Sequence, residues 1–409
     1  MISSNLSKGN PICTLLLFLA GGIACLWTGC MPPVKEKPLS PQQAMERVHF
    51  FYPDFGKDDM DFAALVEAIE RNLEYLERID PQSPFVYNGR VFTCEQIIQT
   101  QKAFKELLLK EPAPAELNRE IRKNFLIYRS VGRKGTGKVL FTGYFEPVYR
   151  ASLEPTDRFR HPLYRRPEDL ISVDLSRFDP QLAGKRIMGR LQGHTLVPYY
   201  TRSQIEAGKA LRGSGLEIAW LENPVDVAFL HIQGSGRLLL QDGQALSVGY
   251  SAYNGRPYRS IGRYMIQEGL VPKEGMSMQA IRAYLTAQPQ MCTQVLDSNP
   301  SYIFFRVLEE GPVGNIQVPL TPGRSLALDD SIFPKGALCF ISCEKPLVNP
   351  DGEITGWVPF SRFVLNQDTG GAIQGAGRAD LFWGSGPYAG TVAGHLKHEG
   401  ELYFLIKKP

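Results

Sequence analysis

Two aspartates near the end of the chain, Asp368 and Asp380, enclose a glycine-rich segment. Such a density of glycine indicates a backbone that turns tightly and can approach a ligand closely. Asp380 is followed at once by Leu381, Phe382 and Trp383, so we expect its carboxyl group to be desolvated, which raises the pKa of a carboxylic acid. A carboxylic acid that keeps its proton near neutral pH can protonate the leaving oxygen of a glycosidic bond. The alternative interpretation is a glycine-rich hairpin that carries two solvated aspartates.

Side chains suited to a saccharide occur elsewhere in the chain. Aromatic rings stack on sugar faces, while Asn, Gln and Arg side chains bind hydroxyl groups. Groups of this kind stand near glycines at Tyr144, Phe145, Gln233, Tyr250, Tyr253, Asn254, Arg256, Tyr258, Arg259, Trp357 and Trp383. Each aromatic residue alone fits a hydrophobic core equally well, so it is the set that indicates a saccharide groove. Glu146 and Glu222 are candidates for a second carboxylate.

Patterns for other chemistries are weaker. The histidines include one close pair, His395 and His398, without a cysteine or acidic cluster beside it, so we predict no metal site. The glycine pairs at 375–377 and 234–236 do not precede a helical run, which argues against a phosphate-binding loop. Ser235 lies between glycines but lacks the pattern of a nucleophile elbow. We therefore expect no cofactor.

Three helical segments precede these motifs and are interpreted as a scaffold. Apolar residues recur at helical spacing over 61–79. Thr93 followed by Gln96 is the signature of a capping box for a helix that runs to about 109. A third helix is predicted from about 115 to 131.

After residue 138 the pattern changes to strands, turns and short helices, which favours an α+β or mainly β architecture. We predict strands at 139–145, 225–233 and 237–241, short helices near 258–268 and 277–287, hairpin turns at Asp242-Gly243 and 350–352, and strand and turn from 299 to the end.

An ordered series of motifs links these segments. The segment 368–375, followed by Asp380, resembles the 3D segment, named for three aspartates, of MltA-type lytic transglycosylases. The third aspartate of that pattern is Asp329, which lies ahead of the Pro-Lys-Gly at 334–336. Five further segments resemble family motifs in the family's order: 141–147, 232–236, 255–262, 276–282 and 299–305.

The resemblance implies a particular fold. It is mainly β with a helical N-terminal part (α+β), and consists of a double-psi β-barrel domain with an inserted smaller β-barrel domain. The barrel domain, with the N-terminal helices, would comprise 44–147 and 255–409, and the MltA-specific insert would comprise 148–254. A glycan strand is expected in the groove between the two domains.

The resemblance also implies a reaction, the cleavage of the β-1,4 bond between N-acetylmuramic acid and N-acetylglucosamine in peptidoglycan. Asp380 aligns with the single catalytic carboxyl group of the family, which acts first as acid and then as base and leaves a 1,6-anhydro-muramic acid end. Asp368 and Asp329 would support it. The residues expected to contact the substrate are Thr142, Gly143, Tyr144, Gln233, Gly234, Ser235, Asn254 and Arg259.

Two alternatives of other classes stay open. A hydrolytic endoglycanase on the same barrel would pair Asp380 with a second carboxylate and a water molecule. A non-catalytic peptidoglycan-binding lipoprotein would use the groove for adhesion alone. Analysis of the products separates the first alternative from transglycosylation, and the absence of any turnover would favour the second.

The N-terminus has the pattern of a targeting segment. Lys8 precedes an apolar run over 11–27 that is too short and too rich in glycine for a comfortable membrane span. The run leads to Thr-Gly-Cys at 28–30, which resembles a bacterial lipoprotein cleavage site. We therefore predict a signal peptide at 1–29 and lipidation of Cys30. A plain secretory signal, an uncleaved anchor and acylation at Cys25 are the alternatives.

The predicted mature chain begins with a tether. Residues 30–43 are rich in proline and lysine and cannot bury much apolar surface. Because Met31 is not aspartate, we expect the lipid anchor to be sorted to the outer membrane, where the protein would face the periplasm. The expected partners are peptidoglycan glycan strands and, through the lipid, the membrane.

Net charge and the cysteine positions do not favour one function over another. A net charge of +3, from 45 basic and 42 acidic residues, argues neither for nor against an anionic partner, and no motif indicates nucleic acid. Cys339 and Cys343 on one strand would lie about 13 Å apart at Cα, beyond the roughly 7 Å limit for a disulfide. A bridge between Cys94 and Cys292 stays open in an oxidising periplasm.

Overall fold

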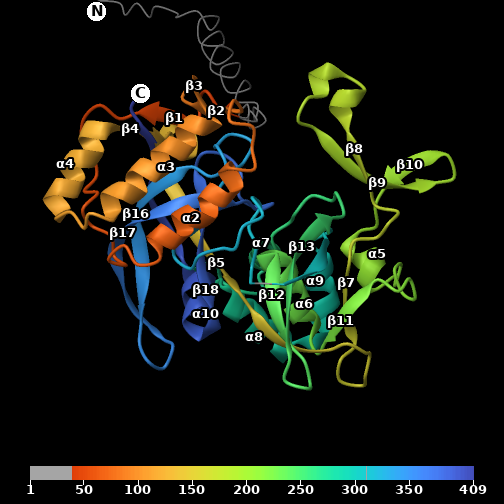
Figure 1. Ribbon diagram of the computed structural model, residues 1–409. Helices are drawn as coiled ribbons and strands as arrows, with labels where there is room; N and C mark the ends of the chain where they lie inside the picture. Colours follow the sequence, from red (N-terminus) through yellow and green to blue (C-terminus); the bar gives the residue numbers. More distant parts are fainter. Residues whose placement is uncertain (1–38, 310) are drawn as a thin grey trace, which may run out of the picture. The chain divides into compact units, whose positions relative to one another are not determined.

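The computed structural model describes residues 39–309 and 311–409 (Figure 1). The predicted signal peptide, Cys30 and most of the predicted tether lie outside the described residues.

Six strands close into a barrel. They are β5 (Val139–Glu146), β15 (Ser325–Ala327), β16 (Leu338–Val348), β17 (Ile354–Asp368), β18 (Arg378–Ser385) and β19 (Lys397–Lys407). Their order is β19-β16-β17-β15-β18-β5, and pairing of β5 with β19 closes the ring. Two neighbouring pairs, β15 with β17 and β18 with β5, are parallel, while the other neighbours are antiparallel. The predicted mainly β architecture with a double-psi barrel is confirmed.

Glycine at a left-handed backbone position makes both predicted hairpin turns. Gly352 has φ of 86° between β16 and β17, and Gly243 has φ of 86° between β12 (Ser235–Leu239) and β13 (Ala245–Tyr253). Glycine adopts this conformation at little cost because it has no Cβ. The two turn predictions are confirmed.

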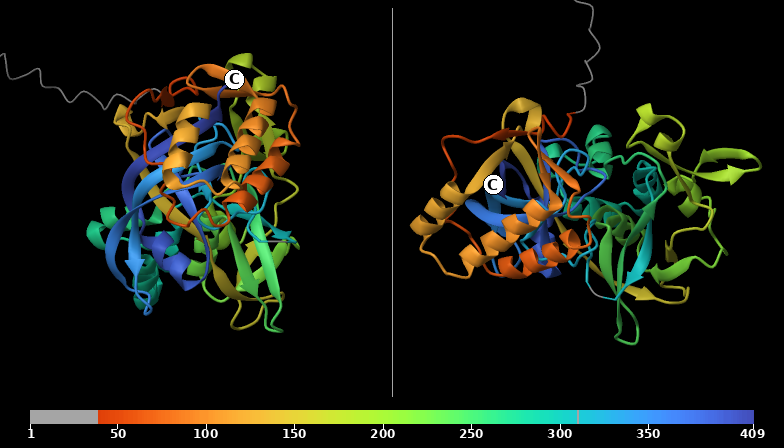
Figure 2. Two further views of the ribbon diagram at one scale, coloured as in Figure 1. Left: turned by 60° about the vertical axis from the view of Figure 1, so that its left-hand side comes forward. Right: turned by 45° about the horizontal axis from the view of Figure 1, so that its top comes forward.

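Helices from the N-terminal part cover one side of the barrel, as Figures 1 and 2 show: α2 (Leu65–Leu76) packs against β17 and α3 (Cys94–Leu108) against β19. Thr93 and Gln96 form the predicted capping box at the start of α3. The ring of Phe363 on β17 has its centroid 4.8 Å from that of Phe104 on α3, so the helix closes the barrel core. A short hairpin of β2 (Pro84–Tyr87) and β3 (Arg90–Thr93) connects the two helices.

The third predicted helix is shorter than expected, and this part of the prediction was wrong. The helix α4 (Pro114–Asn124) ends where β4 (Phe125–Ser130) begins. β4 pairs with β19 on one side and with β1 (Met45–Arg47) on the other. Residues 125–128 are nearly all apolar and buried, so a sheet position stabilises them more than another helical turn would.

A second sheet of six strands is formed by residues that lie between β5 and β15 in the sequence. Its members are β6 (Val148–Ser152), β7 (His161–Tyr164), β11 (Glu217–Leu221), β12, β13 and β14 (Ile303–Leu308), in the order β14-β13-β12-β6-β11-β7. A bridge between Arg165 and Phe305 links the two edges of this sheet.

The predicted strand at 225–233 was wrong, because it is the helix α6 (Pro224–Gln233). Asn223 caps its first turn through the backbone N–H of Val225, and Gly234 ends it in the left-handed conformation. Nearly all of its apolar residues are buried, so the helix has no polar face and its sequence lacks a helical period.

The remaining elements are short or lie beside the two sheets. They are the small sheet of β8 (Ile171–Asp174), β9 (Arg186–Gln192) and β10 (Thr195–Pro198), the helices α5 (Arg202–Glu206), α7 (Ile261–Gln267), α8 (Met278–Ala287), α9 (Cys292–Asp297) and α10 (Gly386–His395), and the 3-10 turns Arg133–Gly135, Leu175–Arg177, Pro180–Leu182, Lys273–Gly275 and Pro289–Met291.

The helix α10 corrects the expectation of strand and turn from 299 to the end. Its sequence contains Gly386, Gly390 and Gly394, which disfavour an isolated helix. Glycine is nevertheless suited to two of these positions, Gly390 and Gly394, where the helix is closely packed. A Cβ on Gly390 would lie 3.4 Å from the ring of Phe145, and one on Gly394 would lie 2.4 Å from the amide of Gln279. Close packing against β5 and α8 therefore stabilises the helix.

The four cysteines of the described residues, Cys94, Cys292, Cys339 and Cys343, are free thiols, so the open alternative of a Cys94–Cys292 bridge is wrong. Cys339 and Cys343 share the strand β16, as expected. Within residues 39–309 and 311–409, no helix is long and apolar enough to span a membrane.

Candidate active site

The barrel brings Asp368 and Asp380 into one row across four strands. Ala327 on β15 pairs with Asp368 on β17 on one side and with Asp380 on β18 on the other. Asp380 in turn pairs with Thr142 on β5. The two aspartates are thus two strand spacings apart, roughly 10 Å at Cα. The small side chain of Ala327 stands between them.

Asp380 is partly buried, and one hydroxyl group donates to it. The Thr142 Oγ1 donates to Asp380 Oδ1 at 2.6 Å. Burial raises the pKa of Asp380 to about 6, while the Thr142 hydroxyl and the charge of Arg378 act in the opposite direction and the charge of Asp368 raises it. This is the direction expected from the apolar residues that follow Asp380 in the sequence.

Asp368 accepts hydrogen bonds from more donors than Asp380 does. The Tyr144 hydroxyl donates to its Oδ2 at 2.9 Å, and the backbone N–H groups of Asn315 and Thr369 donate to its Oδ1 at 3.0 and 2.9 Å. Burial raises the pKa of Asp368 to about 6, and the three donors counteract that effect. Thr142 and Tyr144 are two residues apart on β5 and therefore point to the same face, toward the two carboxyl groups.

Asp329 fastens the glycine-rich segment between the other two aspartates. Its Oδ2 accepts from the backbone N–H of Gly375 at 2.6 Å, and its Oδ1 accepts from the backbone and hydroxyl of Ser331 at 3.0 and 2.5 Å. These contacts use both oxygens of the carboxylate. We therefore interpret Asp329 as a residue that shapes the loop.

The side-chain position of Gly143 is on the face of β5 opposite to the carboxyl groups. A Cβ at this position would lie 2.7 Å from Trp383 Cδ1 and 2.8 Å from the Cα of Ala393 on α10. Only glycine fits there without a shift. Gly143 thus lets α10 and the strand β18 pack closely behind Thr142 and Tyr144.

Gln233, Gly234 and Ser235 connect α6 to β12. The Gln233 Oε1 accepts from the backbone N–H of Phe145 at 2.9 Å, which ties the end of α6 to β5. Gly234 ends the helix with φ of 76°, and Ser235 is buried at the first position of β12. Of the three, Gln233 thus contacts the strand that carries Thr142.

Asn254 is fully buried and supports a loop. Its Nδ2 donates to the carbonyl oxygens of Tyr200 and Pro300 at 2.8 and 2.9 Å, and its Oδ1 accepts from the N–H of Tyr302 at 2.9 Å. These bonds occupy its amide. The loop that follows is tied at Arg259, whose backbone N–H donates to Asn299 Oδ1 at 3.0 Å, while the Arg259 side chain is exposed.

Tyr258 in the same loop reaches the glycine-rich segment. A Cβ on Gly371 would lie 4.0 Å from the Cβ of Tyr258, and the charges of Arg378 and Asp380 both act on the Tyr258 hydroxyl. Arg378 is not among the residues predicted from the sequence to form the site. Its position two residues before Asp380 on a strand is the signal that predicts a shared face. The Asn315 donor had no such signal, because a backbone amide is independent of residue type.

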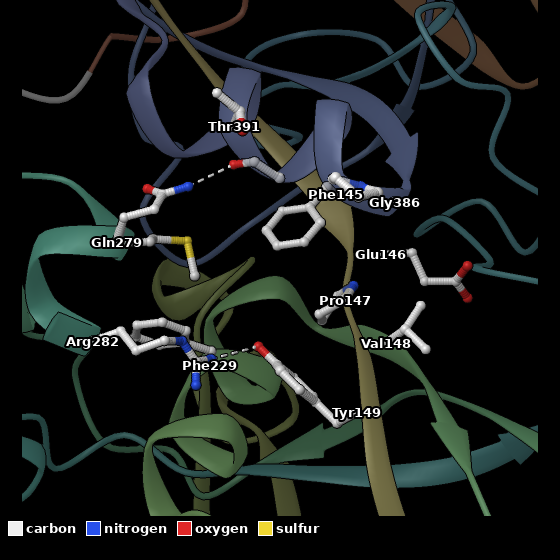
Figure 3. A pocket seen from close by; sticks show the side chains of 13 residues that line it. Phe145, Glu146, Pro147, Val148, Tyr149, Phe229, Gln279, Arg282, Gly386 and Thr391 are labelled. Atoms are coloured by element: carbon white, nitrogen blue, oxygen red, sulfur yellow. Dashed lines mark hydrogen bonds between the residues drawn. The ribbon is translucent and has the colours of Figure 1, made fainter. Parts of the chain in front are cut away.

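A cavity of about 560 Å³ lies beside β5 and α10, and Figure 3 shows several of its lining residues. Phe145, Glu146, Tyr149 and Arg282 belong to its lining, whereas Asp380 does not. Glu146 is buried, and its Oε2 lies 3.7 Å from a guanidinium nitrogen of Arg237.

The two candidate second carboxylates stand outside the row that holds Asp380. Glu146 pairs in register with Ser385, several residues along β5 from the Asp380–Thr142 pair. Glu222 pairs with Arg158 at 3.0 Å on the surface. In the part of the chain that the structure describes, no group of three or more His, Cys, Asp or Glu side chains is arranged to hold a metal ion.

A closed double-psi barrel with a row of carboxyl groups, joined to a second six-stranded sheet, is the class of fold that this chain defines. Two family models match it: the MltA specific insert domain at residues 140–306 and the 3D domain at residues 324–406. Together they match more than half of the chain. The chain therefore belongs to the MltA family, as its motifs predicted.

Curated relatives and solved structures agree with this assignment. A protein of Vibrio cholerae serotype O1 named membrane-bound lytic murein transglycosylase A is 36% identical over 89% of this chain and 90% of its own length. The Escherichia coli K12 protein of the same name is 35% identical over 68% of each chain.

The crystal structure of a membrane-bound lytic murein transglycosylase from Agrobacterium tumefaciens has a TM-score of 0.71 and 32% identity, and covers 89% of this chain and 98% of its own. The structure of E. coli MltA with bound chitohexaose has a TM-score of 0.69 and 26% identity, and covers 92% of this chain and 97% of its own.

Proposed function

We propose that this chain is a peptidoglycan lytic transglycosylase, which cleaves the β-1,4 bond between N-acetylmuramic acid and N-acetylglucosamine. The names of its relatives support murein as the substrate. Chitohexaose, a chain of β-1,4-linked N-acetylglucosamine, occupies one similar structure, which supports a glycan strand as the ligand. The observation that carries the proposal is the row of Asp368, Ala327, Asp380 and Thr142 across the barrel.

In the first step, Asp380 is the general acid. Its carboxyl group is partly buried, and a pKa of about 6 keeps a useful fraction protonated near neutral pH. The proton passes to the glycosidic oxygen while the bond from that oxygen to C1 of the muramyl residue breaks. Asp380 is then a carboxylate.

In the second step, the same carboxylate is the general base. It takes the proton of the C6 hydroxyl group as the C6 oxygen bonds to C1, which closes the 1,6-anhydro ring and restores the acid. The nucleophile is tethered to the reacting sugar, so its effective molarity is high and it can outcompete water. One carboxyl group therefore suffices for both steps.

The neighbouring residues tune this group. Thr142 orients Asp380 through the 2.6 Å hydrogen bond, and the negative charge of Asp368 raises the pKa of Asp380. Tyr144 holds Asp368 at the other end of the row. Tyr258 and Arg378 stand near Asp380 and are suited to contact the sugar.

We also propose where the inserted domain ends. The strand β14 at Ile303–Leu308 completes the sheet that begins with β6 at Val148, so the inserted domain extends beyond the expected 148–254 to about 308.

Lipidation at Cys30 would attach the enzyme to the outer membrane, facing the periplasm, in keeping with relatives named as membrane-bound.

The test is mass spectrometry of the muropeptides that the purified soluble domain releases from sacculi. We expect ends in 1,6-anhydro-N-acetylmuramic acid, lighter by one water than hydrolysed ends and resistant to borohydride. Asp380→Asn should fold normally, because the substitution is isosteric, and lose about 10²–10⁴-fold in rate.

Two results would contradict this function. Reducible ends that carry oxygen from labelled water at C1 would favour the endoglycanase alternative. Full activity of Asp380→Asn would remove Asp380 from the mechanism and direct attention to Glu146 or Glu222.

A further inference from the structure

We propose that Arg71, on the helix α2, and Arg78, in the turn that follows this helix, are positioning residues of the active site. They hold the loop at residues 315–321, whose backbone donates a hydrogen bond to Asp368. Both arginines lie outside the two segments that match the family models, 140–306 and 324–406. The inference rests on the proposed function, because it concerns the same pair of carboxyl groups.

Arg78 holds the end of the loop that touches Asp368. Its guanidinium Nη2 donates to the carbonyl oxygens of Ile316 and Gln317 at 2.8 and 3.2 Å. The residue before Ile316 is Asn315, whose backbone N–H donates to Asp368 Oδ1 at 3.0 Å. The arginine is therefore one residue removed from a donor to the carboxyl group.

Arg71, on α2 and seven residues before Arg78 in the chain, holds the other end of the loop. Its Nη1 donates to the carbonyl oxygen of Leu320 at 3.2 Å and to the Thr321 hydroxyl at 2.9 Å. Glu67, four residues before it on the helix, accepts from its Nη2 at 2.5 Å and fixes the direction of the guanidinium. The two arginines thus clamp the loop at both ends.

Hydrogen bonds within the loop shape the segment between these clamps. Gly314 donates to the carbonyl of Val318, and Gln317 donates to the carbonyl of Gly314, which closes a single turn. The Ile316 N–H also donates to the carbonyl oxygen of Gln367 on β17, but at 3.4 Å, so the arginine contacts at 2.8 and 2.9 Å add to the hold on this turn. Fixing its two ends keeps the Asn315 N–H aimed at the carboxylate.

A buried connection from α2 reaches Asp368 from its other side. Gln367, the residue before Asp368, is fully buried, and its Nε2 donates to the carbonyl oxygen of Ala68 on α2 at 3.2 Å. Its Oε1 accepts from the Ser325 hydroxyl, at the first residue of β15, at 2.6 Å. The helix therefore bonds both to the strand that carries Asp368 and to the loop that hydrogen-bonds it.

Neither arginine touches the reacting carboxyl groups, so their action is on position. Asp368 also accepts from the Tyr144 hydroxyl on β5, a contact that should remain when the arginines are replaced. Loss of the clamp should free the Asn315 amide and displace the Asp368 carboxylate. Because binding of the glycan does not require this donor, the effect should fall on turnover more than on affinity.

The experiment uses the complete soluble protein, residues 31–409, with Arg71→Met, Arg78→Met and the double variant. Methionine removes the donors but keeps an unbranched side chain. Arg119→Met on α4, where the arginine pairs with Glu116 and Glu120 on the surface, is the matched control. Steady-state kcat and KM are measured on solubilised glycan fragments, and deuterium uptake is followed by mass spectrometry on a peptide that spans 311–321.

For the double variant we expect kcat to fall about tenfold, KM to stay within about twofold of the parent, and uptake at 311–321 to become faster. Arg71→Lys and Arg78→Lys should recover part of the kcat, because a lysine can still donate to one carbonyl. The Arg119→Met control should match the parent in both measurements.

A double variant with the kcat of Arg119→Met and unchanged uptake at 311–321 would overturn the inference. A fall in kcat together with slow uptake at 311–321 would also overturn it, because the loop would then be held without the arginines. If the parent shows no turnover, the proposed function fails by itself, and the uptake measurement still decides whether Arg71 and Arg78 hold the loop.

Discussion

Asp368 and Asp380 are both buried enough to have a raised pKa, yet their hydrogen bonds differ. Among the residues that the structure describes, Asp368 accepts from three donors, whereas Asp380 accepts from the Thr142 hydroxyl alone. Donors stabilise the ionised form of a carboxyl group. We infer that a proton taken up by the pair resides on Asp380, which is the residue proposed to deliver it to the leaving oxygen.

Thr142→Val tests this inference, because valine keeps the shape of threonine but removes the hydroxyl donor. The Thr142 hydroxyl lowers the pKa of Asp380, so its removal raises that pKa. Activity that depends on protonated Asp380 declines as pH rises through this pKa. We therefore expect the alkaline limb of the kcat/KM profile to move up by about one pH unit, with a lower maximum rate.

The pH profile of Thr355→Val is the control for this variant. Thr355 is a surface residue on β17 whose hydroxyl donates to the Leu347 carbonyl at 3.3 Å. An alkaline limb that stays at the parent position in Thr142→Val, or moves to lower pH, would contradict the assignment of Asp380 as the acid.

At the scale of elements, the three-residue strand β15 organises the site. It lies parallel to β17 and antiparallel to β18, so it inserts Ala327 between two strands that follow one another in the chain. Arg324, immediately before β15, is fully buried and forms a two-pronged ion pair with Asp58 at 2.6 and 2.8 Å. The N-terminal part of the chain therefore secures this strand as well as the loop beside Asp368.

Gly143→Ala is a prediction about how β5 meets α10. The added Cβ would approach Trp383 Cδ1 within 2.7 Å and the Cα of Ala393 within 2.8 Å, and a backbone atom cannot rotate away as a side-chain end can. Overpacking of this kind costs about 1–3 kcal/mol. We expect a corresponding loss in the free energy of unfolding measured with urea, and a fall in activity because Thr142 and Tyr144 flank this position.

Gly275→Ala is the matched control, because a Cβ on Gly275 meets no atom within 4 Å. Its unfolding free energy should equal that of the parent. If Gly143→Ala were equally stable, the close contact of β5 with Trp383 and α10 would not be the reason for glycine at this position.

At the scale of the whole molecule, the predicted lipid anchor would require the enzyme to reach its polymer from a membrane. The predicted lipid at Cys30 and the proline-rich residues that follow it would attach the barrel to the bilayer by a short tether. A tethered enzyme acts on the peptidoglycan within reach of its linker, so its location limits the region of the wall that it can cleave.

Cys30→Ala should release the protein from membranes into the soluble periplasmic fraction, or leave it mislocalised, because no acyl chain can then be attached. Fractionation and mass spectrometry of the N-terminal peptide measure this. Cys25→Ala is the control and should remain lipidated. Acyl chains and membrane fractionation retained by Cys30→Ala would show that Cys30 is not the attachment site.

Some features of this protein follow from its sequence because they depend on neighbouring residues. The capping box of Thr93 and Gln96 and the turn at Gly352 are local interactions within a few residues of chain, so the same patterns predict them in any fold. The raised pKa of Asp380 was expected for the same reason, because Leu381, Phe382 and Trp383 adjoin it. The ordered motifs identified the family, which in turn implied the barrel.

Other features were decided by contacts between distant segments. The apolar residues of α6 and β4 suit either a helix or a strand. Pairing with β19 makes 125–130 a strand, and burial around α6 together with its two caps makes 224–233 a helix. The glycine-rich α10 is a helix because β5 and α8 accept its close approach.

The site itself belongs to this second group. Asp368 and Asp380 share a row only because β15 pairs with both of their strands, and the Asn315 donor, held by Arg71 and Arg78, has no mark in the sequence around either aspartate. Residue types determined which groups can transfer a proton. Strand pairing determined which of them meet, because a register is a relation between segments, and a hydrogen bond from a backbone amide is independent of residue type.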